Sequence, residues 1–278
     1  MARQEGAHPL PLTRLRRFVE RTASPRYIAV ARIGVGLVAA ARILERGATL
    51  ARLSEPGVIR VPYLEGAPSI ADLPVLAILV AGVGLAAAFS AGLFTWVTGS
   101  ALFLLLGSIL LSDQQLYANN LYLLTLLVGL LTLAGSGAAL SLDARRGRGR
   151  QAVPVWPIVL LRLQISAMYL FTAIAKVNLE FLSGSSLFST LRREGPLAIP
   201  EGWRTFDAMA AASVLAVIVE LLLAFWLWSP RRRATAIAIG VAMHAAIAVW
   251  IAPTLGLVLF ALLMFAVYPV FLDDRRGP

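Results

Sequence analysis

Runs of uncharged apolar residues recur along the whole of this 278-residue chain, and they constrain its fold more than any other feature. Each run is about 18–23 residues long, the length that an α-helix needs to cross the hydrocarbon core of a bilayer. The pattern predicts an all-α fold, a polytopic membrane helix bundle of about eight transmembrane helices. The predicted spans are residues 27–44, 72–90, 92–112, 117–138, 155–177, 208–229, 234–252 and 254–271.

The composition excludes other classes of protein. Only 14% of the residues are charged, whereas soluble domains have about 25%. A transmembrane β-barrel would alternate apolar and polar residues in shorter segments. Cysteine is absent, and the two histidines are His8 and His244. Disulfides, Cys-ligated metals and a His-cluster metal site are therefore excluded, and we expect no metal cofactor.

Two glycine-containing hexapeptides, residues 34–39 and 82–87, match the G-x-G-x-x-A pattern of dinucleotide-binding turns. Such a site requires a strand, a turn and a helix in succession. Both hexapeptides instead lie inside apolar spans, where small residues let helices approach one another closely. We therefore interpret them as helix-packing segments and expect no nucleotide cofactor.

The arginines indicate how the helices are oriented. They are concentrated in four segments outside the spans, residues 14–26, 145–150, 231–233 and 275–276. Eight spans with the N-terminus inside place all four segments on the cytoplasmic side, as the positive-inside rule requires. The net charge of +10 is thus explained by membrane topology, and we expect no nucleic-acid partner. The predicted location is the cell membrane (plasma membrane or bacterial inner membrane), crossed several times, with the lipid bilayer as partner.

The same topology gives the domain organisation. Residues 1–26 are expected to form a basic cytoplasmic arm, residues 27–271 a single transmembrane domain, and residues 272–278 a short cytoplasmic tail. The longest external connection, residues 178–207, covers a site or simply joins two helices; connections of this length are functional more often than short ones.

Lys176 is the one lysine among 25 basic residues, and it lies near the external end of the fifth span. A buried lysine can lose its proton, whereas an arginine stays charged. An ionisable residue inside a membrane span is costly and is a functional-site candidate for that reason. The alternative is that Lys176 extends to the lipid headgroups as an ordinary helix-end anchor.

The fifth span carries a polar stripe. Arg162, Ser166, Tyr169 and Lys176 follow one another at steps of four, three and seven residues, so they share one helix face. Lipid offers no polar partners, and the stripe is therefore predicted to point into the bundle. The alternative is a stripe that only satisfies hydrogen bonds between helices.

Counting residues from the helix ends predicts two polar layers. The inner layer is a buried cluster in which Glu220 is expected to neutralise Arg162 or Arg32, with His244 close by. Lys176 is expected in an outer layer of amides and phenols, which would favour the neutral amine. The alternative is that Asp113, in the same layer, pairs with Lys176 and holds the ammonium form. The inner layer comprises Arg32, Arg162, Gln164, Glu220 and His244, and the outer layer Asp113, Gln114, Gln115, Tyr117, Asn119, Asn120, Tyr122 and Lys176.

The fifth span and the residues after it resemble a known family signature. Residues 161–178 read L-R-L-Q-I-S-A-M-Y-L-F-T-A-I-A-K-V-N, and Phe181-Leu182-Ser183-Gly184 follows. This segment is similar to the signature of the HTTM family, the horizontally transferred transmembrane domain that is shared with vitamin K-dependent γ-carboxylase. Residues 31–34, 119–123 and 220–244 resemble three further motifs of the family, so that the resemblance covers roughly residues 25–270.

The resemblance implies a catalytic role for Lys176. In the carboxylase the matching lysine is the amine base that initiates oxygenation of vitamin K hydroquinone, and a neutral amine in an apolar site suits that deprotonation. The family's neighbouring histidine appears here as Asn120, which can form hydrogen bonds but cannot accept the proton. The catalytic candidates are Lys176 and Asn120, and the candidates for binding the quinol are Asn119, Tyr122, Tyr169 and Arg162.

Three functions are consistent with these residues. The first is an enzyme that uses a reduced quinone of the vitamin K or menaquinone type, with Lys176 as base and a peptide or protein substrate on the external face. The large extracytoplasmic domain of the carboxylase is not expected after residue 271. The second is a non-catalytic membrane partner that holds a peptide for maturation or export. The third is a small-solute transporter whose pathway includes Arg162, Glu220 and His244.

Overall fold

The computed structural model of the protein describes residues 16, 19–63, 66, 69–191, 198–251 and 254–272. Within them the long helices are α2 (Arg26–Leu53), α3 (Val75–Ala91), α4 (Thr95–Ser112), α5 (Asn119–Leu133), α6 (Val155–Ala175), α9 (Phe206–Trp226), α10 (Arg233–Trp250) and α11 (Leu255–Val267). The shorter elements are α7 (Leu179–Leu182), α8 (Ser185–Thr190), the 3₁₀ turns η1 (Ile70–Asp72), η2 (Gln114–Leu116), η3 (Ser136–Ala138), η5 (Glu201–Trp203) and η6 (Tyr268–Phe271), and the π turn η4 (Ala144–Arg148).

The all-α prediction is confirmed, and each predicted span contains one long helix. In the part of the chain that the structure describes, five helices are by length and composition able to cross a bilayer: α2, α4, α6, α9 and α10. The segments Val75–Ala91, Asn119–Leu133 and Leu255–Phe271 are apolar but shorter. The protein is therefore a multi-pass membrane protein, and the count of eight crossings stays a prediction.

The helix ends lie at two faces of the bundle. One, which we call the arginine face, comprises residues 21–26, 92–95, 134–154, 231–233 and 268–272. The antiparallel strands β1 (Thr22–Ala23) and β2 (Val153–Pro154) join the starts of α2 and α6 there. Arg32 reaches the ends of α3 and α5, and Arg233 donates to the carbonyl of Phe271 after α11. With the exception of Arg16, the described arginines of the predicted cytoplasmic segments lie at this face.

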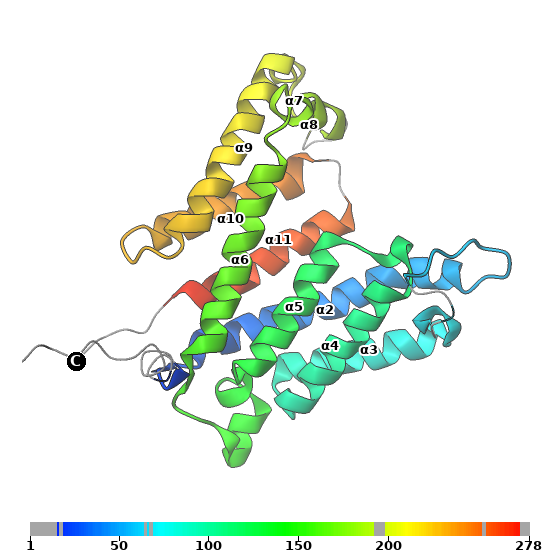
Figure 1. The fold of residues 1–278 in the computed structure, drawn as a ribbon, viewed down its shortest axis with the longest axis vertical. Coiled ribbons are helices and arrows are strands. Elements are labelled where there is room, and N and C mark those ends of the chain that lie inside the picture. The colour runs from blue at the N-terminus through cyan, green and yellow to red at the C-terminus, as the bar shows by residue number, and fades with distance from the viewer. Residues whose placement is uncertain are drawn as a thin grey trace, which may run out of the picture.

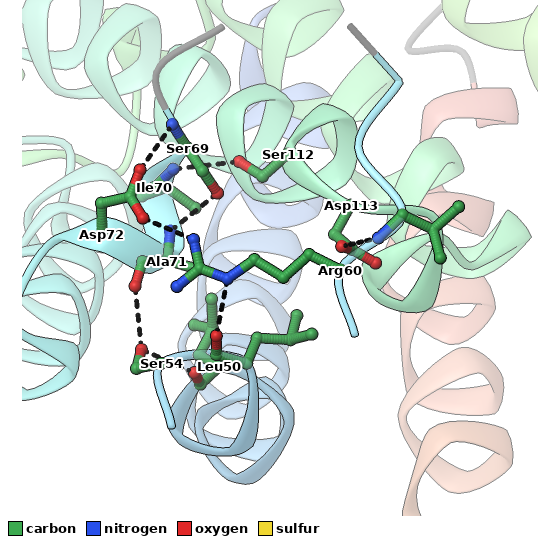
Figure 2. Close-up of polar contacts among 11 residues, drawn as sticks. Leu50, Ser54, Arg60, Ser69, Ile70, Ala71, Asp72, Ser112 and Asp113 are labelled. Carbon is green, nitrogen blue, oxygen red and sulfur yellow. Dashed lines mark hydrogen bonds and ion pairs between the residues drawn. The ribbon is translucent and has the colours of Figure 1, made fainter. Parts of the chain in front are cut away.

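The opposite face comprises, of the described residues, 54–63, 66, 69–74, 112–119, 175–191, 198–206, 250–251 and 254–257. Figure 2 shows how η1 links the ends of α2 and α4 there. The Ser54 hydroxyl, directly after α2, donates to the Ala71 carbonyl, Ile70 N–H donates to the Ser112 hydroxyl at the end of α4, and Arg60 pairs with Asp72. Leu191 bridges to Ile251 at the end of α10, and Asn120 donates to the carbonyl of Gly256 at the start of α11. Successive long helices therefore run in opposite directions between the two faces.

Small residues set the spacing around α2, which lies against α3, α5 and α11 (Figure 1). A β-carbon on Gly34 would come within 2.5 Å of Ala266 in α11, and one on Gly36 within 2.7 Å of Ser90 in α3. A β-carbon on Gly82 would come within 3.0 Å of Ile43. These are glycines of the two hexapeptides, which lie within α2 and α3 as the packing interpretation predicts.

Candidate functional site

The predicted polar stripe of α6 makes contacts to other elements of the bundle. Arg162 donates through Nε to the Val270 carbonyl at 2.9 Å, and Ser166 accepts from the Trp228 indole at 2.7 Å. Tyr169 and Lys176 bond to side chains of α9, α10 and η6. Ala173, between them, is fully buried. The stripe therefore faces inward and connects α6 to the elements that follow it.

The centre of the site is an ion pair between Lys176 and Glu220. Lys176 is the C-cap residue of α6, and its Nζ lies 2.6 Å from Glu220 Oε1 on α9. The ammonium also lies 5.8 Å from the ring centroid of Phe181. The lysine side chain is 29% exposed and the glutamate side chain 9%, so the lysine is the more accessible member of the pair.

The second carboxylate oxygen of Glu220, Oε2, is buried and has no hydrogen-bond partner among the described residues. The Thr172 hydroxyl lies beside this carboxylate, but it donates to the carbonyl oxygens of Met168 and Tyr169. A buried carboxylate oxygen without a donor is costly. The pair is thus a place where a further proton or a hydroxyl group would be stabilised.

A second polar group lies one step along the stripe. The Tyr169 hydroxyl is 2.8 Å from His244 Nε2 on α10 and 2.6 Å from the Tyr268 hydroxyl of η6. All three residues are buried. Gly240 leaves room for Tyr268, since a β-carbon there would come within 2.0 Å of its hydroxyl oxygen. Glu220 acts electrostatically on Tyr169, and Lys176 on His244, so the two groups form one buried polar region.

The predicted partner of Glu220 was wrong. Glu220 pairs with Lys176 and not with Arg162 or Arg32, because α6 and α9 do not start and end at the same depth. The first turns of α9 extend past the end of α6 and pack on α7 and α8 (Figure 1). There Gly184 fits against Met209 and Ala210, and Phe188 stacks on Phe206. The predicted depth of each polar residue was obtained by counting residues from the helix ends, which is valid only if the helices begin and end at the same level.

Arg32 and Gln164 also lie outside the expected inner cluster. Arg32 is fully buried, and its guanidinium donates to the carbonyl oxygens of Ser90, Ser136, Ala139 and Leu140. It therefore satisfies the Ser90 carbonyl in the last turn of α3, which has no intrahelical donor, and the carbonyls of η3 and the residues directly after it. Gln164 is half-buried on α6, two residues from Arg162. Of the predicted inner layer, the structure brings Glu220 and His244 into one region.

The predicted outer layer does not surround Lys176. Asn120 accepts a hydrogen bond from Arg42 and donates to the Gly256 carbonyl, and Arg42 pairs with Glu45 at 3.0 Å. Asp113 accepts from the backbone N–H groups of Val61 and Gln115. These contacts tie the ends of α2, α4, α5 and α11 together. The exposed side chains of Asn119 and Tyr122 stay candidates for ligand contact on prediction alone.

Sequence reasoning missed both the Lys176–Glu220 pair and the participation of Tyr268. One signal was available: Glu220 is the only carboxylate well inside the apolar runs, and Lys176 the only lysine. Two lone opposite charges in lipid are expected to meet. Tyr268 gave no such signal, because a tyrosine near the end of a span is equally typical of an interface anchor.

A family model for the HTTM domain matches residues 20–275 of this chain. The chain belongs to the HTTM domain family. The HTTM domain is related to the membrane domain of vitamin K-dependent carboxylases, and the match includes every long helix described above. No curated protein and no solved structure is similar enough to be matched to the chain. The resemblance of the chain to the HTTM family is thus confirmed, whereas the roles of individual residues stay predictions.

Proposed function

We propose that this HTTM protein is a membrane enzyme in which the Lys176–Glu220 pair removes a proton from a ring hydroxyl of a reduced quinone. The observation that carries the proposal is the 2.6 Å contact between a half-buried lysine and a carboxylate that has one unpartnered oxygen. Buried, oppositely charged ionisable groups in contact are typical of sites that transfer protons.

The pair differs from the lone amine base that the sequence suggested. As a unit, Lys176 and Glu220 carry no net charge, so they can lie in an apolar region at lower cost than either ion alone. The unit can accept one proton, after which the lysine is an ammonium and the glutamate a carboxylic acid. The Glu220 carboxylate receives the proton, and Lys176 then stabilises the negative charge that is left on the hydroxyl oxygen.

The surroundings of Lys176 suit a lipid-soluble ring. Ile174, Val177 and Leu179 are exposed apolar side chains on the same end of α6 and on α7, and Phe181 offers an aromatic face beside the ammonium. A ring that diffuses in the bilayer could approach the pair without crossing water. When bound, a reduced quinone would supply an ionisable hydroxyl and two electrons for reduction of oxygen.

The remaining residues are assigned by their contacts. Tyr169, His244 and Tyr268 hold α6 against α10 and η6, and they fix the position of the pair along the bundle. Asn120 supports Arg42 and the start of α11, so we propose a positioning role for it. Arg162 precedes Lys176 by 14 positions, which corresponds to about 21 Å of helix, and it therefore lies outside the proposed site.

The test is epoxide formation by purified protein given reduced menaquinone or vitamin K, oxygen and bicarbonate, with products read by mass spectrometry. Lys176→Met removes the ammonium that stabilises the negative charge on the hydroxyl oxygen, and Glu220→Gln removes the proton acceptor. Each is expected to lower the rate at least about 100-fold. Glu201→Gln, at a carboxylate that is 93% exposed, should leave it unchanged.

Absence of epoxide from folded wild-type protein that binds quinone would contradict the proposal. A non-catalytic partner would then be tested by capture of a peptide on residues 178–207. The transporter pathway that includes Arg162 is not favoured, since Arg162 bonds to Val270 while Glu220 bonds to Lys176.

A further inference from the structure

A cavity of about 680 Å³ opens at the arginine face, far from the Lys176–Glu220 pair. It lies where the starts of α2 and α6 meet the residues that follow α11 (Figure 1). Its polar side chains come from three separate stretches of the chain. They are Arg21, Thr22, Ser24, Tyr27, Gln151 and Arg162.

The charge of this cavity is positive. Arg21 and Arg162 line it, and none of its described lining residues is a carboxylate. The N-terminal ends of α2 and α6 border it as well, and neither has an acidic residue in its first turn or a side-chain cap. Helix N-termini carry partial positive charge and unpaired N–H groups. Two arginines and two helix dipoles therefore attract an anion to one place.

The walls of the cavity are held in position by local structure. The β1–β2 pairing fixes the backbone on one side, and Val155 N–H donates to the Arg21 carbonyl at 2.9 Å. On the other side Arg162 is held by the Val270 carbonyl and lies 5.9 Å from the Phe271 ring centroid. The cavity is thus a built feature of the fold and does not depend on flexible side chains alone.

The rest of the lining is apolar. Ile28, Val155, Ile158, Val270 and Leu272 complete the wall. A cavity with a cationic side and an aliphatic side suits a molecule with the same two parts. Arginine binds phosphate oxygens through several parallel hydrogen bonds, and basic pockets at the ends of membrane helices bind anionic lipid headgroups.

We propose that this cavity binds the phosphate group of an anionic phospholipid at the predicted cytoplasmic surface. A phosphate ester dissolved in the cytoplasm shares the same recognition chemistry, and the aliphatic wall favours the lipid. The proposal is independent of the proposed function, since Arg162 and Lys176 are separated by about 21 Å along α6.

The test is native mass spectrometry of full-length protein in detergent, titrated with phosphatidylglycerol and, separately, with phosphatidylcholine. Wild-type protein should bind phosphatidylglycerol at least about tenfold more tightly, because the arginines favour the net anionic lipid. Arg21→Gln should weaken that binding about tenfold, as expected for loss of a hydrogen bond to a charged group. The matched control is Arg26→Gln, an exposed arginine five positions away that does not line the cavity.

Equal weakening by Arg21→Gln and Arg26→Gln, or equal binding of the two lipids, would overturn the proposal, because unspecific surface attraction would then explain the result. Displacement of phosphatidylglycerol by millimolar sn-glycerol 3-phosphate would identify a soluble phosphate ester as the ligand. Binding of phosphatidylglycerol that resists this displacement would identify the lipid as the ligand.

Asp273 and Asp274 follow Leu272 in the sequence and lie outside the described residues. If Asp273→Asn with Asp274→Asn raises lipid binding more than about tenfold, the chain's own tail occupies the cavity and the proposal fails.

Discussion

At the scale of single residues, the Lys176–Glu220 contact makes the two side chains interdependent. Removing one partner leaves the other buried without compensation, which is costly for a largely buried pair and less so where water reaches it. We therefore expect Glu220→Gln and Lys176→Met each to lower the free energy of unfolding by about 1–3 kcal/mol. Unfolding can be followed in detergent by the fluorescence of the tryptophans.

The double variant Lys176→Met with Glu220→Gln provides the control for this pair. With neither charge present, most of the lost stability should return, and the coupling energy from the double-mutant cycle should be about 1 kcal/mol or more. Strictly additive losses would mean that the two side chains do not stabilise one another. That result would remove the basis for treating them as one proton-accepting unit.

The residue types of the site were predictable from the sequence, but most of their partners were not. Lys176, Tyr169, Glu220 and His244 stood out because polar side chains inside apolar runs are rare and costly. Their pairing depends on how far one helix is shifted along its neighbour. That shift is set by contacts such as Gly184 against Met209, which no periodicity in α6 or α9 encodes.

At the scale of helices, Arg32 joins two elements that are distant in sequence. Its guanidinium donates five hydrogen bonds to carbonyl groups at the end of α3 and in and directly after η3, the turn that follows α5. A lysine keeps the charge but lacks the planar fork that reaches several acceptors at once. We expect Arg32→Lys to lower the free energy of unfolding by about 2–4 kcal/mol, since buried carbonyls lose their donors.

The control for Arg32 is Arg145→Lys, which makes the same exchange at an exposed position of the same face. It should change the midpoint of thermal unfolding very little. A loss in Arg32→Lys no larger than in this control would show that charge alone, without the geometry of the guanidinium, is sufficient at residue 32.

Asp143 stabilises the start of α4 from outside that helix. Burial raises the pKa of this carboxyl, but the Thr95 N–H, the Thr95 hydroxyl and the Phe94 N–H donate to it and bring the pKa below its ordinary 3.8. The folded protein therefore binds this proton less tightly than the unfolded chain. The resulting stabilisation is fully present above pH 3.8 and is lost as the pH falls through the lowered folded value.

Asp143→Asn should consequently destabilise the protein by about 1–2 kcal/mol at neutral pH and by progressively less below pH 3.8. The measurement is the difference in thermal midpoint between the two proteins at several pH values. A hydrogen bond from Arg60 similarly lowers the pKa of the exposed Asp72, but this residue is present in both proteins and cancels in the difference. A difference that stays constant down to pH 3 would contradict the assigned role.

Helix ends show where local sequence signals are weak. The sequence predicted that the first span ends at residue 44, whereas α2 continues to Leu53. Glu45 pairs with both Arg42 and Arg46, so charged residues that resemble the end of a span are neutralised within the helix. The charged residues after residue 44 therefore do not mark the end of helix α2.

At the scale of the whole molecule, the bundle separates charge between its two faces. The described segments of the arginine face are strongly basic, whereas the opposite face carries charges of both signs, such as Arg60 with Asp72 and Arg204 with Glu201. This is the distribution that the positive-inside rule associates with the cytoplasmic and external sides. It supports the predicted orientation without establishing how many helices cross the bilayer.

The natural absence of cysteine permits a direct test of topology with single introduced cysteines and a membrane-impermeant maleimide. Eight crossings place residues 114 and 189 outside and residue 145 inside. Gln114→Cys and Ser189→Cys should therefore react in intact cells, and Arg145→Cys only after permeabilisation. All three side chains are exposed, so differences in labelling report the side of the membrane.

If only the five longest helices crossed, residue 114 would lie on the same side as residue 145. Protection of Gln114→Cys in intact cells would thus overturn the eight-span arrangement.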